Sequence, residues 1–322
     1  MSRKTSGLSC IFTVDKPSGM SSHDVVAKVR HIIGESRVGH AGTLDPAATG
    51  VLVVGVGPAT RLLGMLTLDE KSYEAKICFG SQTSTDDAEG EIIRQASVPT
   101  ALLDKEFAAS ELAALVGEHE QVPPAFSAVS VNGCRAYMRA RAGEKVELTP
   151  RHVQIFEAHL LGITQQAQDC VIWRCAFRVS KGTYIRSIAR DLGLQLKTAA
   201  HLSALCRTSS GGLSLDTCVS LDELKVQRAQ LLCAHAVDPV RALGLPVRLL
   251  DAHELPFVSD GKHIPVGSVI DVSGSEYGLR PPKEAEMVSI VYGNHLLGLW
   301  KACGPVLICK ANFPGGVSGV RP

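Results

Sequence analysis

Apolar residues recur at the three- and four-residue spacing of an amphipathic helix in several stretches of the chain. The stretch after Ser22 is the clearest, because serine caps helices and Gly34 stands where the apolar pattern stops. A second stretch follows the turn 181–183, where Thr183 is placed to cap a helix. Ser220 opens a further helix with a capping box. The patterns predict helices over 22–33, 58–66, 104–116 and 183–196, and from Ser220 onward.

Other stretches have the alternation of β-strands. From Tyr73 to Phe79 apolar side chains occupy every second position, which places them on one face of a strand. The run 51–56 is almost wholly apolar, as in a strand buried on both faces. Strands are predicted at 11–16, 51–56, 73–79 and 171–179.

The segment from Gln121 to Arg151 has neither pattern. Pro123 and Pro124 make its start extended and rigid. Cations and one aromatic residue follow, at Arg135, Tyr137, Arg139, Arg141, Lys145 and Arg151. With so little core-forming periodicity, this segment is predicted to be an excursion from the core.

Short strands with glycine and proline between them fill the end of the chain. They are predicted at 267–272, 287–292 and 296–300, which indicates a small β-rich domain. The boundary is expected between Arg241 and Pro246, giving domains of residues 1–243 and 244–322.

The length of 322 residues suits about two domains, and an apolar content of 45% is that of a globular protein. No apolar run reaches the roughly 18 residues that a membrane span needs. The apolar patch from Leu8 to Val14 is too short for a signal peptide, so we expect a cytoplasmic protein without a membrane segment. The formal net charge of +1 neither favours nor excludes binding to nucleic acid.

Metal-binding spacings are missing from the sequence. The ten cysteines include no C-x-x-C pair, and no H-E-x-x-H motif occurs. Scattered cysteines in a cytosolic chain are mostly small buried apolar residues. We therefore expect no metal site.

The loop from Gly39 to Gly50 contains the strongest candidate chemistry. It presents one carboxylate, Asp45, among glycine, threonine and proline, directly before the apolar strand 51–56. An isolated Asp-Pro is usually a turn, in which the carboxylate bonds its own backbone. Three glycines and His40 at fixed offsets exceed what a turn requires, so Asp45 is a candidate nucleophile.

This loop resembles the catalytic loop of the TruB family of tRNA pseudouridine-55 synthases, whose pattern is approximately G-H-x-G-x-L-D-P-x-A-x-G. Further segments between about Val14 and Leu215 resemble the same family. They are Asp15-Lys16-Pro17-x-Gly19-x-x-Ser22, Lys71-Ser72-Tyr73-Glu74-Ala75, residues 121–141, Ser180-Lys181-Gly182-Thr183-Tyr184-Ile185-Arg186-Ser187 and, more weakly, residues 205–213.

The resemblance implies roles for two residues besides Asp45. Tyr73 would stack on the target base, although periodicity alone favours a core tyrosine. Arg186 would pair with the Asp45 carboxylate and keep it ionised, whereas a surface arginine paired with Asp191 or another acid is the plainer interpretation.

The resemblance also implies a set of RNA-binding residues. His40 would help position the flipped nucleotide, although a lone histidine is more often structural. The 121–151 excursion would wrap an RNA stem-loop, although a solvated charged loop is the commoner meaning of such a charge run. The full RNA-binding set is His40, Lys16, Lys181, Tyr184, Arg141 and Tyr137.

The implied reaction is isomerisation of one uridine to pseudouridine. The uridine, in the T stem-loop of tRNA, would be extruded into a pocket and attacked by Asp45. The glycosidic bond would break, the uracil would rotate, and C5 would bond to the ribose, with no cofactor or metal. Which atom Asp45 attacks stays open. The implied protein is of α+β class with the pseudouridine synthase fold: a central mixed, largely antiparallel sheet and a C-terminal PUA-like domain. Nothing in the sequence calls for an oligomer, so a monomer is expected.

Two other functions stay open. A non-catalytic RNA-binding or RNA-folding protein on the same scaffold would not need Asp45, whose charge opposes phosphate binding. A glycosidase usually needs two acids. Asp86, Asp87 and Glu89 are candidates only within a polar loop, and the pairing of Arg186 has no place in that chemistry.

Overall fold

The computed structural model describes residues 6–66, 68–127, 129–131, 134–141, 143–144, 148–167, 169–272 and 278–321, without the side chains of 130–131, 134–135, 140–141 and 229. The chain divides into two compact units. The first unit combines residues 1–46, 50–67 and 211–322, and the second combines 47–49 and 68–210. The predicted boundary near residue 243 lies within the first unit, and the predicted domain division stays a prediction.

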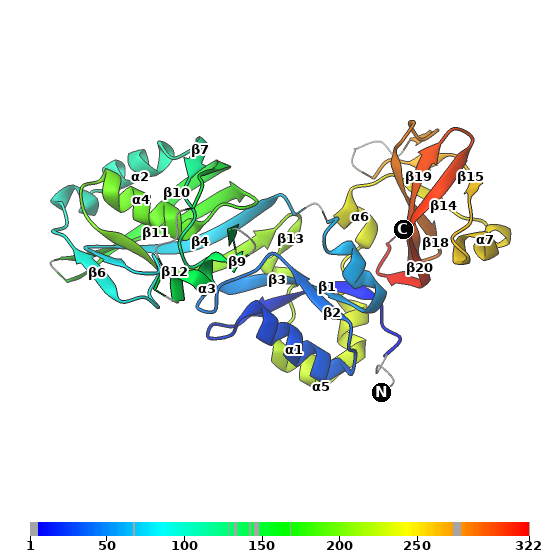
Figure 1. Ribbon diagram of the computed structural model, residues 1–322, viewed down its shortest axis with the longest axis horizontal. Helices are drawn as coiled ribbons and strands as arrows, with labels where there is room; N and C mark the ends of the chain where they lie inside the picture. The colour runs from blue at the N-terminus through cyan, green and yellow to red at the C-terminus, as the bar shows by residue number, and fades with distance from the viewer. Residues whose placement is uncertain are drawn as a thin grey trace. The chain divides into compact units, whose positions relative to one another are not determined.

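An antiparallel sheet forms the centre of the second unit, with strands in the order β12-β4-β11-β10-β7 (Figure 1). The strands are β4 (Glu70–Phe79), β7 (Gly117–Gln121), β10 (Arg151–Ala167), β11 (Cys170–Ser180) and β12 (Ala200–Ser210). The strands predicted at 73–79 and 171–179 are confirmed as parts of β4 and β11. Their apolar residues form a core in which the rings of Phe79 and Trp173 meet edge to face, with centroids 4.7 Å apart.

Helices pack on this sheet. Helix α2 (Lys105–Ala113) packs against β10, and helix α4 (Ile185–Gln195) packs against β12 and β4. A Cβ on Gly193 would lie 2.6 Å from the backbone nitrogen of Ala200, so glycine is what lets α4 approach the start of β12. The smaller elements of this unit are β5 (Ser81–Thr83), β6 (Ile92–Gln95), η2 (Thr100–Leu103), β8 (Ser130–Val131), β9 (Cys134–Arg135) and α3 (Ala136–Arg141).

The start of α4 differs from the prediction. Its N-cap residue is Tyr184, which makes no side-chain capping bond. The Thr183 hydroxyl instead lies 3.3 Å from the hydroxyl of Ser180. The prediction that Thr183 caps this helix is therefore wrong, because the turn at 181–183 takes one residue more than expected.

The first unit begins with three strands and two helices. Strands β1 (Cys10–Lys16) and β2 (Val38–Ala41) both pair antiparallel with β3 (Thr49–Val56). Helices α1 (Ser22–Ile33) and α5 (Leu221–Ala234) lie side by side and share an apolar core with β1 and β3 (Figure 1). The helix predicted at 58–66 is a shorter 3₁₀ helix, η1 (Gly57–Leu62), and η3 (Leu215–Thr217) and β13 (Leu213–Ser214) precede α5.

Capping boxes open both helices. The box at Ser220 is confirmed, since its hydroxyl accepts from the N–H of Glu223. In α1 the cap is Ser21, which forms the box with Asp24. The prediction of Ser22 as the cap is wrong by one residue, and Ser22 has another use, described below.

The rest of the first unit is β-rich, as predicted. Seven strands form a sheet in the order β15-β20-β19-β18-β14-β16-β17, in which only the β14–β18 pair is parallel among the described pairs. The strands are β14 (Val247–Leu249), β15 (Ile264–Pro265), β16 (Val269–Ile270), β17 (Leu279–Arg280), β18 (Met287–Tyr292), β19 (His295–Cys303) and β20 (Val306–Ser318). The helical segments are α6 (Pro239–Leu243), η4 (Ala252–Glu254) and α7 (Leu255–Ser259). The α+β class is thus confirmed.

None of the helices in the described ranges combines the length and apolar character needed to cross a bilayer.

Candidate active site

Asp45 lies half-buried in a loop between β2 and β3, and buried side chains hold the residues on both sides of it. On one side, the Ser22 hydroxyl accepts from the N–H of Leu44 at 2.9 Å and donates to its carbonyl at 3.0 Å. Ser22 is only 2% exposed, so water does not compete for these bonds. One serine thereby fixes the backbone of the residue before Asp45.

On the other side, Lys16 holds Pro46. The Lys16 ammonium donates to the carbonyls of Pro17 at 2.9 Å, Met20 at 2.6 Å and Pro46 at 3.0 Å. Three donors on an ammonium match three acceptors, which is what makes the burial of this charge tolerable. The N–H of Gly19 donates to the same Pro46 carbonyl at 2.9 Å. The loop containing Asp45 is thus tied to the segment between β1 and α1.

The expectation that Lys16 binds RNA stays a prediction, and its burial bears on it. The Lys16 side chain is 0% exposed, so it offers no surface to a nucleic acid in this structure. The physical reason is that its ammonium is enclosed by backbone carbonyls of its own loop. Lys16 thus positions the Asp45 loop.

His40 reaches the same loop along β2. It is half-buried and pairs in register with Val54 of β3, five residues before Asp45. The expected contact between His40 and a flipped nucleotide stays a prediction.

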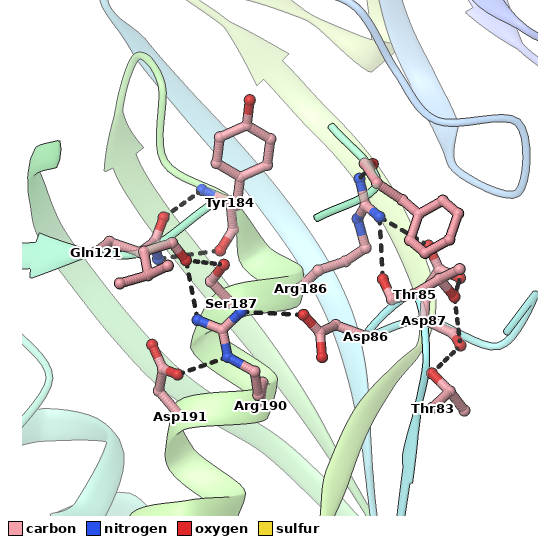
Figure 2. Close-up of polar contacts among 12 residues, drawn as sticks. Thr83, Thr85, Asp86, Asp87, Gln121, Tyr184, Arg186, Ser187, Arg190 and Asp191 are labelled. Atoms are coloured by element: carbon pink, nitrogen blue, oxygen red, sulfur yellow. Dashed lines mark hydrogen bonds and ion pairs between the residues drawn. The ribbon is translucent and has the colours of Figure 1, made fainter. Parts of the chain in front are cut away.

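In the second unit, Arg186 is the centre of a buried polar cluster (Figure 2). Its side chain is 5% exposed, and one of its terminal nitrogens lies 3.3 Å from a carboxylate oxygen of Asp87. The same guanidinium donates to the carbonyls of Thr85 and Phe126, both at 3.0 Å. Arg186 is buried and not on the surface, but it does pair with an acid other than Asp191, as the plainer interpretation allowed. Its pairing with Asp45, a residue of the other unit, stays a prediction.

Asp87 is itself held in place, as Figure 2 shows. The Thr85 hydroxyl donates to one of its carboxylate oxygens at 2.5 Å, and the N–H of Glu89 donates to the same oxygen at 3.1 Å. Sequence reasoning had placed Asp87 only in a polar loop. Its proximity to Arg186 comes from tertiary packing between segments about 100 residues apart, which no local pattern encodes.

A second pair, Arg190 with Asp86, lies beside the first (Figure 2). The two side chains are 3.0 Å apart, and Arg190 also contacts Asp191 at 2.8 Å. Burial raises the pKa of the Asp86 carboxyl, and the charge of Arg190 opposes that rise. Asp191, considered above as a partner for Arg186, is therefore a partner of Arg190.

The extended start of the 121–151 excursion is tied to α4. The side-chain amide of Gln121 donates to the carbonyl of Tyr184 at 3.1 Å and accepts from its N–H at 2.8 Å. Ser187 and Arg190 both donate to the carbonyl of Val122 at 2.9 Å. These bonds fix the helix that carries Arg186 against the segment that leads into the excursion.

The remaining predicted residues of this unit lie in different surroundings. Tyr73 is 7% exposed on β4, opposite Phe177 of β11. Lys181 is 72% exposed in its side chain and pairs with Asp69 at 2.7 Å. Tyr137 is 38% exposed on α3. The side chain of Arg141 and residues 145–147 lie outside the described part of the chain.

Possible metal ligands gather at one place in the described part of the chain. Asp251, His253 and Glu254 have ligand atoms within 4.8 Å of one another. Glu254 already pairs with Arg248 at 2.7 Å, so one carboxylate of the group is engaged by a cation. This group lies in the β-rich region and shares no residue with the sites above.

Comparison with known proteins agrees with this geometry. The model of the TruB family pseudouridylate synthase N-terminal domain matches residues 30–185. The chain is 49% identical over 257 residues to a protein named tRNA pseudouridine synthase B from Thermobifida fusca, covering 79% of this chain and 86% of that one. A protein of the same name from Nocardia farcinica is 44% identical over 266 residues, covering 82% and 85%.

A solved structure shares the fold. The structure of an H/ACA ribonucleoprotein bound to a substrate RNA containing 2'-deoxyuridine superposes with a TM-score of 0.64 at 22% identity, covering 98% of this chain and 88% of that one. The predicted pseudouridine synthase fold is thereby confirmed, and the C-terminal sheet is consistent with a PUA-like domain. With nearly half of its residues identical to those of a named relative over most of its length, the chain belongs to the TruB family of pseudouridylate synthases.

Proposed function

We propose that this protein converts uridine-55 in the T-loop of tRNA to pseudouridine, with Asp45 as the nucleophile. The observation that carries the proposal is the fixed setting of Asp45, whose two neighbours are held by buried Ser22 and buried Lys16. A carboxylate that only shaped a turn would not need two buried side chains to fix its backbone. A nucleophile does, because small misplacements of reacting groups cost orders of magnitude in rate.

The proposed reaction moves one uracil from its N1 to its C5 attachment. The T-loop uridine leaves the stack, and Asp45 forms a transient covalent bond to it. The glycosidic bond breaks, the uracil turns and C5 bonds to the ribose. The bond to Asp45 breaks again, the proton on C5 leaves to solvent, and N1 gains a proton from solvent. Every other atom is retained, so the reaction balances without an oxidant, a reductant or a second substrate.

Arg186, Tyr73 and the RNA-binding residues have supporting roles in this proposal. Arg186 keeps the Asp45 carboxylate ionised in the complex, and Tyr73 stacks on the target base. His40, Lys181, Tyr184, Tyr137 and Arg141 contact the T stem-loop. We further propose that the protein acts as a cytoplasmic monomer, which sedimentation in solution and fractionation of cells would test.

Tritium release from C5-labelled uridine in an unmodified tRNA transcript tests the proposal. Wild-type protein should release tritium and Asp45→Asn should not, although the variant should bind the transcript as tightly as wild type. A transcript with cytidine at position 55 should release none. Binding without release by wild type would instead favour an RNA-binding or RNA-folding protein. Release by Asp45→Asn at the wild-type rate would remove Asp45 as the nucleophile.

A further inference from the structure

A hollow of about 570 Å³ lies in the first unit, and its lining includes Gly39 and His40 at the start of the loop that contains Asp45. It is formed by the last turn of α1, the segment that leads into β2, and η1. The residues that give it chemical character are Arg30, Ser36, Arg37, His40, Thr60 and Leu63. The lining thus includes two arginines, a histidine and a serine, and none of its residues is an acid.

The Arg30 guanidinium is fixed in orientation. Its Nη2 donates to the carbonyl of Val38 at 2.7 Å, and its Nε is buried without a hydrogen-bond partner among the described residues. This one bond anchors the guanidinium beside β2 and leaves its other N–H groups available to a ligand. Arg37, the second arginine of the lining, is exposed to solvent.

Glu35 precedes the lining residue Ser36 but does not itself line the hollow. Glu35 is 2% exposed and accepts from the backbone N–H groups of Ser6 at 3.0 Å and Arg37 at 2.9 Å. Burial would raise the pKa of Glu35, but these hydrogen bonds and the charge of Arg37 lower it overall. Glu35 therefore stays ionised and bound to the loop backbone, and it cancels part of the charge of Arg37 without lining the hollow.

The end of α1 opposes an anion only weakly. A helix C-terminus carries about half a negative charge, whereas two guanidinium groups carry two positive charges. The N–H of Gly34 also donates to the carbonyl of Arg30, which satisfies one of the exposed acceptors at that end. The net charge around the hollow therefore remains positive.

We propose that this hollow binds a phosphate group of the RNA backbone of the substrate. A phosphate is the group that two guanidiniums and a hydroxyl recognise best, because its oxygens accept several charge-assisted hydrogen bonds at once. A phosphate here would lie beside β2, the strand that carries His40 and leads into the Asp45 loop. This inference rests on the proposed function for the identity of the RNA as tRNA, but not for the binding of phosphate.

The salt dependence of tRNA binding tests the proposal. Each phosphate contact adds about 0.7–0.9 to the slope of log K against log salt concentration. Arg37→Gln should lower the slope by about that amount and weaken binding roughly 3- to 10-fold at physiological salt. Arg37→Lys, which keeps the charge, should keep most of the slope. The matched control is Lys28→Gln, which removes one exposed cation from α1 outside the hollow and should leave the slope unchanged.

A second arm separates the two sources of phosphate. Inorganic phosphate at millimolar concentration should show a broadened phosphorus resonance with wild-type protein and a sharper one with Arg37→Gln. Phosphate binding together with an unchanged tRNA slope would overturn the RNA assignment and leave a site for a free anion. No change in either experiment would overturn the site.

The same measurements keep the two proposals apart. One outcome is that wild type releases no tritium from tRNA while Arg37→Gln still lowers the salt-dependence slope of RNA binding. In that case the proposed function is wrong and the phosphate site is supported. If wild type isomerises tRNA and Arg37→Gln binds like wild type at every salt concentration, the function stands and the hollow does not bind RNA phosphate.

Discussion

Replacement of Lys16 by methionine tests the support of the Asp45 loop most directly. The substitution keeps the unbranched apolar stem and removes the ammonium that donates to Pro17, Met20 and Pro46. Hydrogen bonds from a charged donor contribute about 1.5–3 kcal/mol each, so three contribute about 4.5–9 kcal/mol. Burying the ammonium costs several kcal/mol, which offsets much of that gain. We expect Lys16→Met to lose about 2–3 kcal/mol of unfolding free energy.

The effect on catalysis should be larger than the effect on binding. Released from the ammonium, the Pro46 carbonyl keeps only the N–H of Gly19, and the carboxylate of Asp45 next to it loses its fixed position. A displacement near 1 Å can cost about 100-fold in rate, so kcat should fall by about that factor while KM changes little. Single-turnover tritium release gives the rate, and urea unfolding followed by circular dichroism gives the stability.

Two results would refute this reasoning. If Lys16→Met has the stability and rate of wild type, the ammonium is not what holds the three carbonyls in position. A loss of tRNA affinity with an unchanged kcat would mean that Lys16 contacts RNA in the complex despite its burial here. Lys28→Met, which removes an exposed cation, serves as the control for the loss of one charge.

Three further predictions concern other buried groups. Ser22→Ala should lose both hydrogen bonds to Leu44 and about 1–2 kcal/mol of unfolding free energy. Its kcat should also fall, and a wild-type kcat would contradict the role of Ser22 in positioning Asp45. Asp87→Asn should remove a buried carboxylate from beside Arg186 and lower the free energy of unfolding in urea by about 2–4 kcal/mol; an unchanged value would mean that the pair contributes nothing. Burial, with the charge of Arg207, lowers the pKa of Lys71 to about 8, so the folded state disfavours its proton. Lys71→Met should therefore stabilise the protein by about 1–2 kcal/mol at pH 7, after allowance for solvent screening. The gain should shrink progressively as the pH rises above 8. A urea midpoint below that of wild type at pH 7 would contradict this prediction.

The regular elements were predictable from local patterns. Alternation in 73–79 and the helical stripe after Ser22 were enough, because burial of one face decides such elements. Their ends were less predictable: Ser21 and Ser22 are both able to cap α1, and tertiary structure assigns Ser22 to Leu44 instead. Capping a helix needs only neighbouring residues, whereas the hydrogen bonding of Ser22 to Leu44 needs a loop 22 residues away.

The candidate site was predictable only in part. The sequence pointed to Asp45 through its loop and to Arg186 through its motif, but not to Asp87 as the buried partner of Arg186. Lys16 looked like a cation for RNA because its type and motif carry no information about enclosure. Its three acceptors are backbone carbonyls, which every residue has, so no side-chain pattern could reveal them.

The division of the chain into two units has a consequence for synthesis on the ribosome. Almost all of the second unit is one continuous stretch, residues 68–210, which can fold as soon as it emerges. Strand β1 of the first unit can pair early with β3. Its other backbone hydrogen bonds, and that of Ser9 before it, must wait because they reach Val219, Val237 and Ser318.

At about 5–20 residues per second, the hundred or so residues after Ser210 take on the order of 5–20 s to appear. For that time the apolar residues of β1 have no complete core, and they are natural substrates for a chaperone. The nascent protein would acquire its Arg186 cluster before β1 gains its last hydrogen bonds.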